Sequence, residues 1–430
     1  MPQLLPLRGL RYSAAAGPLD DLLAPPYDVI TPAQQRALEG RSPYNAVYLE
    51  LSEGGEDRYG RVAALVRDWQ ASGVIARDAS PMLYVYEQHF VESGRIYHRR
   101  ALIAGVEAQP WDEGAVKPHE FTMSGPKEDR LRLLEATKVQ FSPVFMIARD
   151  RAGQLTRFIE ATIASAPPAV EATTSADGDL HRLWAVEASS YELKQIAPLF
   201  GESFYIADGH HRYETAVNYK NRRMAEGELP RDHPARFAMT AIVAADDPGL
   251  VIRPIHRMVP RQAPADWRQR LRGAFEVREV KLLGQGSNRA AEASALLADD
   301  PANIVALGLE GADAQVLRLR APAALATRIP AGHSERWAAI SPNVLRYGVL
   351  GPLWDITDDD LRRGVVEYSH DTAEVLDFQH SRPESTCFLL NPVGIGEVMA
   401  LADQGERMPQ KSTFFHPKLG TGLVFNPLEP

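Results

Sequence analysis

The chain has 430 residues, of which 45% are hydrophobic and 24% are charged, and its formal net charge is −9. This composition is ordinary for a globular protein that is long enough for two domains. The acidic balance argues against nucleic acid as a main partner, because that affinity comes mostly from Lys and Arg. With no signal peptide and no apolar stretch of about 18 residues, we expect a cytoplasmic protein without a membrane partner.

The first predicted helix follows a segment stiffened by prolines, residues 22–30. Thr31 is expected as its N-cap, Pro32 as its first residue, and Gln34 as the acceptor that closes a capping box. Asp28 lies on the stiff segment before this helix as a lone carboxylate. Alone, this residue indicates little about function.

The next elements predict one sheet. Residues 58–72 have apolar positions at helical spacing, and the alternation over residues 82–106 is typical of a β-hairpin. Strands are expected at residues 142–148 and 183–186. Because both strands read as parts of one sheet, we interpret residues 164–179, rich in Ala, Pro, Thr and Ser, as a surface loop and not a domain boundary.

Residues 119–130 concentrate charge around a Gly-Pro turn, and a helix is predicted from Pro126. Glu120, Lys127 and Arg130 make this segment a candidate lid or substrate clamp. The alternative is a charged, solvated first turn whose acids complement the helix dipole. The two interpretations have similar weight, and the second histidine of a helical zinc-protease motif is absent.

The most informative segment is residues 204–216, which predicts a strand, a tight turn and a helix. His210, His211 and Arg212 then lie at a helix N-terminus, where each added cation costs about 0.3 to 1 kcal/mol unless a negative group offsets it. A bound phosphate or carboxylate would provide that offset, with Gly209 allowing its close approach. The alternative is that the histidines cap carbonyls and that Arg212 pairs with Glu214 or a distant acid.

Beyond about residue 260, helices and strands alternate and predict a second α/β domain. The last segment contains Lys411 and Lys418 among hydroxyl and aromatic residues. It is either a further anion-binding group or a pair of solvated lysines. We expect three parts: residues 1–260, residues 261–405, and a segment from 406 to 430 that folds back on the first domain.

The box Asp208-Gly-His-His-Arg212 resembles the ParB/sulfiredoxin superfamily, whose members bind nucleotide phosphates at a corner that opens a helix. Within that superfamily it is most similar to the box of the free L-serine kinases. Over nearly its whole length the chain also resembles a bacterial and archaeal family known as a domain of unknown function. The segments that carry this similarity are residues 26–30, 125–130, 141–145 and 408–413.

Two departures separate the chain from its other relatives. Sulfiredoxins have a reactive cysteine where His210 stands, and ParB-type proteins have a DNA-binding module and a basic surface. The resemblance therefore implies a mixed α/β or α+β fold, with a ParB/sulfiredoxin-like nucleotide-binding core, large insertions and a second α/β domain. The implied activity is phosphoryl transfer to a small hydroxylated metabolite.

The implied enzyme is an ATP- or ADP-dependent phosphotransferase that needs Mg²⁺ and acts on free serine or phosphoserine in either direction. Asp208 would accept the serine proton or hold the metal, with Asp28 and Glu120 as rivals. The expected phosphate and substrate ligands are Gly209, His210, His211, Arg212, Lys127, Arg130, Lys411 and Lys418. A non-catalytic nucleotide sensor is the alternative, and the oligomeric state stays open. Replacing Arg212 by Ala is expected to reduce turnover by orders of magnitude and to leave the melting temperature nearly unchanged.

Overall fold

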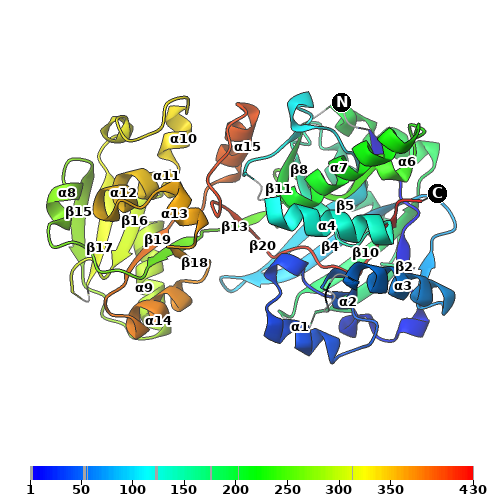
Figure 1. Cartoon of the computed structure of the whole chain (residues 1–430), viewed down its shortest axis with the longest axis horizontal. Coiled ribbons are helices and arrows are strands. Elements are labelled where there is room, and N and C mark those ends of the chain that lie inside the picture. Colours follow the sequence, from blue (N-terminus) through cyan, green and yellow to red (C-terminus); the bar gives the residue numbers. More distant parts are fainter. Residues whose placement is uncertain are drawn as a thin grey trace. The chain divides into compact units, whose positions relative to one another are not determined.

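The computed structural model describes residues 3–51, 55, 57–121, 124–174, 177–201, 203–311 and 313–429 (Figure 1), and only the backbone of residues 124–127, 198 and 200. The chain divides into two compact units. The first contains Met1–Pro118, Thr122–Val251 and Pro417–Pro430, and the second contains His119–Phe121 and Ile252–His416. The boundary thus follows Val251, earlier than the expected residue 260. The end of the chain joins the first unit from Pro417 onward.

The first unit is built on a nine-stranded sheet with the order β6-β11-β8-β12-β5-β4-β10-β9 and with β1 against β5. β8 runs parallel to β12 and β11 parallel to β6, whereas β4, β5 and β10 pair antiparallel, so the sheet is mixed. The strands of this unit are β1 Leu4–Leu5, β2 Leu10–Tyr12, β3 Ile75–Arg77, β4 Met82–Glu92, β5 Arg95–Glu107, β6 Val116–Lys117, β7 Val139–Gln140, β8 Val144–Ala148, β9 Val170–Thr173, β10 Leu180–Glu187, β11 Phe204–Asp208, β12 Phe237–Ala244 and β21 Asn426–Pro427. Its α-helices are α1 Pro32–Glu39, α2 Val47–Glu50, α3 Arg58–Ala71, α4 Ser124–Thr137, α5 Gln154–Ser165, α6 Ser190–Ile196 and α7 His210–Glu226.

Most local predictions for this unit are confirmed. The Thr31 hydroxyl accepts from the Gln34 amide and the Gln34 side chain accepts from the Thr31 amide, which completes the capping box. β4 and β5 form the expected hairpin, with positive φ at Ser93 and Gly94. The prediction of a loop over residues 164–179 is wrong in part, because β9 pairs with β10 at the edge of the sheet. β9 is short and half exposed, so its sequence has little apolar alternation.

The main core of the first unit lies on one face of this sheet. Alternate strand residues such as Val85 and Ile242 pack there against Phe158 of α5 and Tyr213 of α7. α4 and α7 lie side by side (Figure 1), with Leu131 and Leu134 packed against Tyr219. The C-terminal strand β21 pairs with β7, which directly follows α4. These contacts hold α7 against α4, and α4 leads directly into the strand that pairs with the C-terminal β21.

The second unit is a six-stranded antiparallel sheet of order β15-β17-β16-β19-β14-β18. Its strands alternate between two cores: Ile304 and Phe388 face α8, α11 and α12, whereas Val305 and Cys387 face α9 and α14. Burial on both faces explains the uninterrupted apolar runs in these strands. The elements are β13 Val251–Arg253 at the boundary, β14 His256–Val259, α8 Trp267–Leu271, β15 Phe275–Val280, α9 Ser287–Ala298, β16 Asn303–Leu307, β17 Ala314–Leu319, α10 Glu335–Ala339, α11 Ser341–Leu345, α12 Gly351–Trp354, α13 Asp358–Arg362, β18 Glu367–Ser369, α14 Thr372–Ser381, β19 Thr386–Leu390, α15 Ile395–Asp403 and β20 Phe414–His416.

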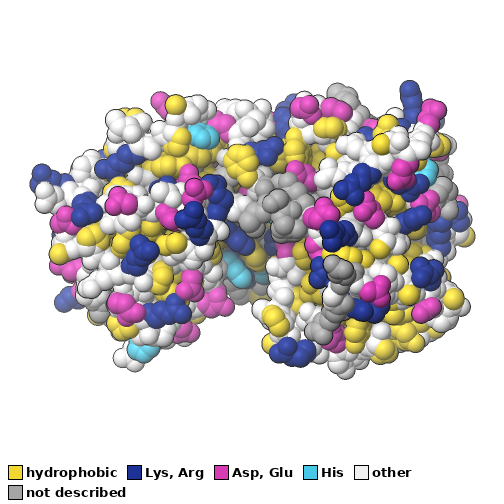
Figure 2. All heavy atoms as spheres, viewed as in Figure 1, with side chains coloured by type: hydrophobic (Ala, Val, Ile, Leu, Met, Phe, Trp, Pro, Cys, Tyr) yellow, Lys and Arg dark blue, Asp and Glu magenta, His cyan; other side chains and the backbone are white. Residues whose placement is uncertain are grey.

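Basic and acidic side chains are interspersed on the face of the molecule drawn in Figure 2. Within the described part of the chain, no helix combines the length and the apolar character that crossing a bilayer requires.

Candidate functional site

The predicted strand-turn-helix corner is confirmed in the first unit. β11 ends at Asp208, Gly209 adopts the left-handed region with φ 88°, and α7 begins at His210. A residue with a Cβ pays roughly 1 to 2 kcal/mol in this region, which favours glycine at the turn. The first intrahelical hydrogen bond runs from the Tyr213 amide to the Gly209 carbonyl (3.0 Å). The amides of the three residues before Tyr213 therefore have no acceptor within the helix.

Asp208 is held by two cations at this corner. Its Oδ2 accepts from Arg212 Nη2 (2.6 Å), and its Oδ1 accepts from Lys418 Nζ. Burial acts to raise the pKa of Asp208, but Lys418 and Arg212 outweigh it and lower the pKa to about 2. The carboxylate is thus ionised at neutral pH, and both of its oxygens already accept hydrogen bonds. This geometry suits an anchor for Lys418 and Arg212 better than a proton acceptor.

The partner of Arg212 differs from the sequence-based expectation. Its Nη2 donates to Asp208, and its Nη1 donates to the carbonyl of Pro143. Neither of the sequence-based interpretations, a bound anion or a pairing with Glu214 or a distant acid, named Asp208 as this partner. Glu214, the partner named in the alternative, instead accepts from the indole Nε1 of Trp111 (3.2 Å). Whether Arg212 also binds a ligand stays a prediction.

We expect the stabilisation that Asp208 provides to be lost in acid. An unfolded Asp titrates near pH 3.9, so its lower folded pKa gives a contribution that is complete above about pH 4 and lost as the pH falls through about 2. Urea unfolding should give a larger free energy of unfolding for the wild type than for Asp208→Asn at pH 4. This difference between the two proteins should shrink by roughly 2 kcal/mol as the pH falls from 4 to 2. A difference that is constant with pH would contradict the ion-pair assignment.

A second charged cluster includes two residues that the sequence analysis did not select, Glu50 and Tyr27. Arg130 Nη1 donates to Glu50 Oε2 (3.0 Å), and the Arg130 guanidinium lies 4.2 Å from the ring centre of Tyr27. The hydroxyl of Ser142 donates to Glu50, which is only 4% exposed. Burial raises the pKa of Tyr27 to about 12, although Arg212 and Arg130 act to lower it. The sequence signal for this cluster is Glu50 itself, a carboxylate within the otherwise apolar residues 46–51.

The two clusters form one site. Burial acts to lower the pKa of Arg212, but the carboxylates of Asp208, Asp28 and Glu50 raise it overall. Arg130 and Arg212 line a cavity of about 60 Å³. Since a water needs roughly 10 to 15 Å³ on this measure, the cavity holds a few waters but not a nucleotide. The site contains three cations and four carboxylates: Arg130, Arg212 and Lys418 with Asp28, Glu50, Asp129 and Asp208.

Asp28 differs from the other carboxylates of the site. It lies in a short 3-10 helix, Tyr27–Val29, and its side chain is exposed. Over the described residues it accepts no hydrogen bond and forms no ion pair, yet it is close enough to raise the pKa of Arg212. Asp28 is thus an accessible carboxylate within electrostatic range of a partly buried cation, Arg212.

The remaining predicted residues are distributed as follows. His210 is buried and near enough to Asp208 to lower its pKa, and the carbonyl of His211 accepts from Thr215 Oγ1 (2.7 Å). Glu120 and Lys411 belong to the second unit, where the Lys411 amide donates to Glu120 Oε1 (2.7 Å). Their place in the site stays a prediction. The side chain of Lys127 lies outside the described residues.

The profile of a family described as "Protein of unknown function (DUF1015)" matches residues 4–331. The chain belongs to this family. The match covers the main body of the first unit and extends into the second. The match confirms the family similarity expected from the sequence over residues 4–331, whereas the link to the ParB/sulfiredoxin superfamily stays a prediction. None of the curated proteins with which this DUF1015 chain was compared matches it.

Three solved structures are similar to this DUF1015 chain. A free serine kinase in complex with ADP is 14% identical, with 75% of this chain and 92% of that chain covered and a TM-score of 0.33. A conserved hypothetical protein from Pyrococcus furiosus is 14% identical, with coverages of 74% and 93% and a TM-score of 0.31. SbnI from Staphylococcus aureus, with a C-terminal truncation, is 12% identical, with coverages of 76% and 87% and a TM-score of 0.33. At these identities and TM-scores, the similarity does not identify catalytic or binding residues in this chain.

Proposed function

We propose that this chain is a nucleotide-dependent phosphotransferase that acts between ATP or ADP and free serine or phosphoserine. One observation carries the proposal: at the first turn of α7, Arg212 and Lys418 are fixed around Asp208, and an exposed carboxylate, Asp28, is close enough to act electrostatically on Arg212. Phosphoryl transfer needs charge stabilisation, alignment and a base for the hydroxyl, and little covalent chemistry from the protein. Arg212 and Lys418 would stabilise charge and align the phosphates, and Asp28 would be the base.

The nucleotide phosphates would bind at the N-terminal turn of α7. The amides of a helix's first turn have no acceptor within the helix, and with the positive end of the helix dipole they favour anions there. Gly209 has no Cβ to obstruct the approach of an anion. The ion pairs with Asp208 hold Arg212 and Lys418 in place before a ligand arrives. The cavity beside Arg212 is too small for a nucleotide, so the base and ribose would lie outside it.

Mg²⁺ would enter with the nucleotide. This ion is usually held by phosphate oxygens, waters and one or two carboxylates, and it supplies charge neutralisation at the transferred group. Both Asp208 oxygens already accept from cations, so the site does not favour the metal role expected for Asp208. Asp28, which is exposed, would take the proton of the serine hydroxyl.

The proposal is tested by incubating the pure protein with phosphoserine, ADP and Mg²⁺ and measuring ATP and serine, and then by running the opposite reaction. We expect one ATP formed for each serine released. Absence of turnover in both directions would contradict the proposal. If ADP or ATP still bound in calorimetry, that result would favour the sensor function, in which the same corner binds nucleotide without reacting.

A further inference from the structure

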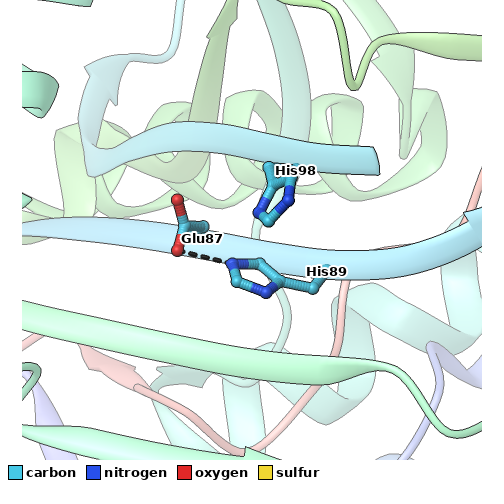
Figure 3. A group of neighbouring side chains, drawn as sticks. All are labelled: Glu87, His89 and His98. Carbon is cyan, nitrogen blue, oxygen red and sulfur yellow. Dashed lines mark hydrogen bonds and ion pairs between the residues drawn. The ribbon is translucent and has the colours of Figure 1, made fainter. Parts of the chain in front are cut away.

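A second group of ligand-type side chains lies on the β4–β5 hairpin, apart from the residues used above. Glu87 and His89 are two positions apart on β4, so they face the same side of the sheet. His98 on β5 pairs directly with His89 in the register of the hairpin. Strand periodicity and register thus bring three potential metal ligands to one face, as Figure 3 shows.

The three side chains are close together. Glu87 Oε1 and His89 Nε2 lie 2.6 Å apart, and the ring centres of His89 and His98 lie 4.0 Å apart. One ligand atom from each residue can be chosen so that all lie within 4.8 Å of one another. A tetrahedral Zn²⁺ with bonds of about 2.0 Å needs ligand atoms about 3.3 Å apart. The His98 side chain is exposed, so its ring can rotate by the small amount that this geometry requires.

The charges around the cluster are compatible with a cation. Glu87 also accepts from Arg100 Nε (2.9 Å), and Arg182 lies 3.7 Å from it. Each arginine has a second acid: Glu171 accepts from Arg182 Nε (2.6 Å), and Glu160 lies 3.8 Å from Arg100. Three carboxylates therefore face two arginines, and the patch is negative by one charge when both histidines are neutral.

We propose that Glu87, His89 and His98 form a binding site for one divalent transition-metal ion, with Zn²⁺ as the best match. Two imidazoles and one carboxylate are a ligand set that zinc accepts, with water in the fourth position. The ion would replace the proton shared by Glu87 Oε1 and His89 Nε2. The neutral imidazole of His89 would then carry its proton on Nδ1. The bound ion would cross-link β4 and β5. This site is independent of the phosphotransferase proposal.

The test uses the full-length chain without a histidine tag, at about pH 7.5, where an ordinary histidine is mostly neutral. Isothermal titration with Zn²⁺ should give one equivalent bound, and Co²⁺ should give the visible absorption of a low-symmetry site. His98→Ala changes an exposed residue, so the chain should still fold, and we expect its Zn²⁺ affinity to fall at least tenfold. His380→Ala, which removes an exposed histidine from α14, is the matched control and should bind as the wild type does.

Three results would overturn the proposal. The first is a wild-type chain that binds no Zn²⁺ at micromolar concentration. The second is unchanged affinity in both His98→Ala and His89→Ala. The third is an equal loss in the His380→Ala control, which would place the ion elsewhere.

Discussion

Replacing Arg212 by Ala is expected to reduce phosphoryl transfer by about 100- to 1000-fold, the usual effect of removing one electrostatic donor from a transition state. The structure also changes the expected effect on stability. Arg212 and Asp208 form a partly buried ion pair, with 12% and 15% of their side chains exposed, and breaking a buried pair from one side costs up to about 3 to 5 kcal/mol. The melting temperature should therefore fall, contrary to the expectation from the sequence. Steady-state kinetics and urea unfolding measure the two effects.

Arg212→Lys separates the two effects. A lysine keeps the positive charge beside Asp208 but loses the second donor that reaches the Pro143 carbonyl. Most of the stability should return, while turnover should stay well below that of the wild type. If the folded Arg212→Ala protein bound nucleotide and turned over as the wild type does, the assignment of the corner as the phosphate site would be wrong.

Asp28→Asn is expected to reduce turnover by about 100- to 10,000-fold, because the amide cannot accept the serine proton. The residue is exposed and forms no ion pair with the described residues, so the free energy of unfolding should change by less than about 0.5 kcal/mol. Nucleotide affinity, measured by calorimetry, should change little, since the phosphates bind at α7. A large loss of activity without a loss of stability would assign the residue to chemistry.

Asp68→Asn is the matched control, because Asp68 is an exposed carboxylate on α3 of the same unit. It should leave activity and stability unchanged. Wild-type turnover in Asp28→Asn would remove Asp28 from the mechanism.

The local part of the site was predictable. The apolar run before Asp208, the glycine after it and the helical spacing that follows are short-range signals, and the structure confirms the strand, the turn and the helix. The capping box at Thr31 and the hairpin of β4 and β5 were predictable for the same reason. Each depends on residues a few positions apart, whose backbone preferences act before any tertiary contact forms.

The electrostatic partners were not predictable. Lys418 reaches Asp208 across 210 positions, and Glu50 reaches Arg130 across 80. A sequence pattern reveals that a cation needs a partner, but several acids can serve and only chain topology selects one. For this reason the sequence left a bound anion, Glu214 or a distant acid as possible partners of Arg212, whereas in the fold Arg212 pairs with Asp208.

The sequence by itself determined the mixed α/β character of the chain, the corner at Gly209 and the residue types gathered there. Only the tertiary structure decided which charges are paired, which carboxylate stays exposed, and that Lys418 at the end of the chain contacts Asp208. The physical reason is that secondary structure follows from local backbone preferences, whereas ion pairing and burial depend on which distant segments the sheet brings together.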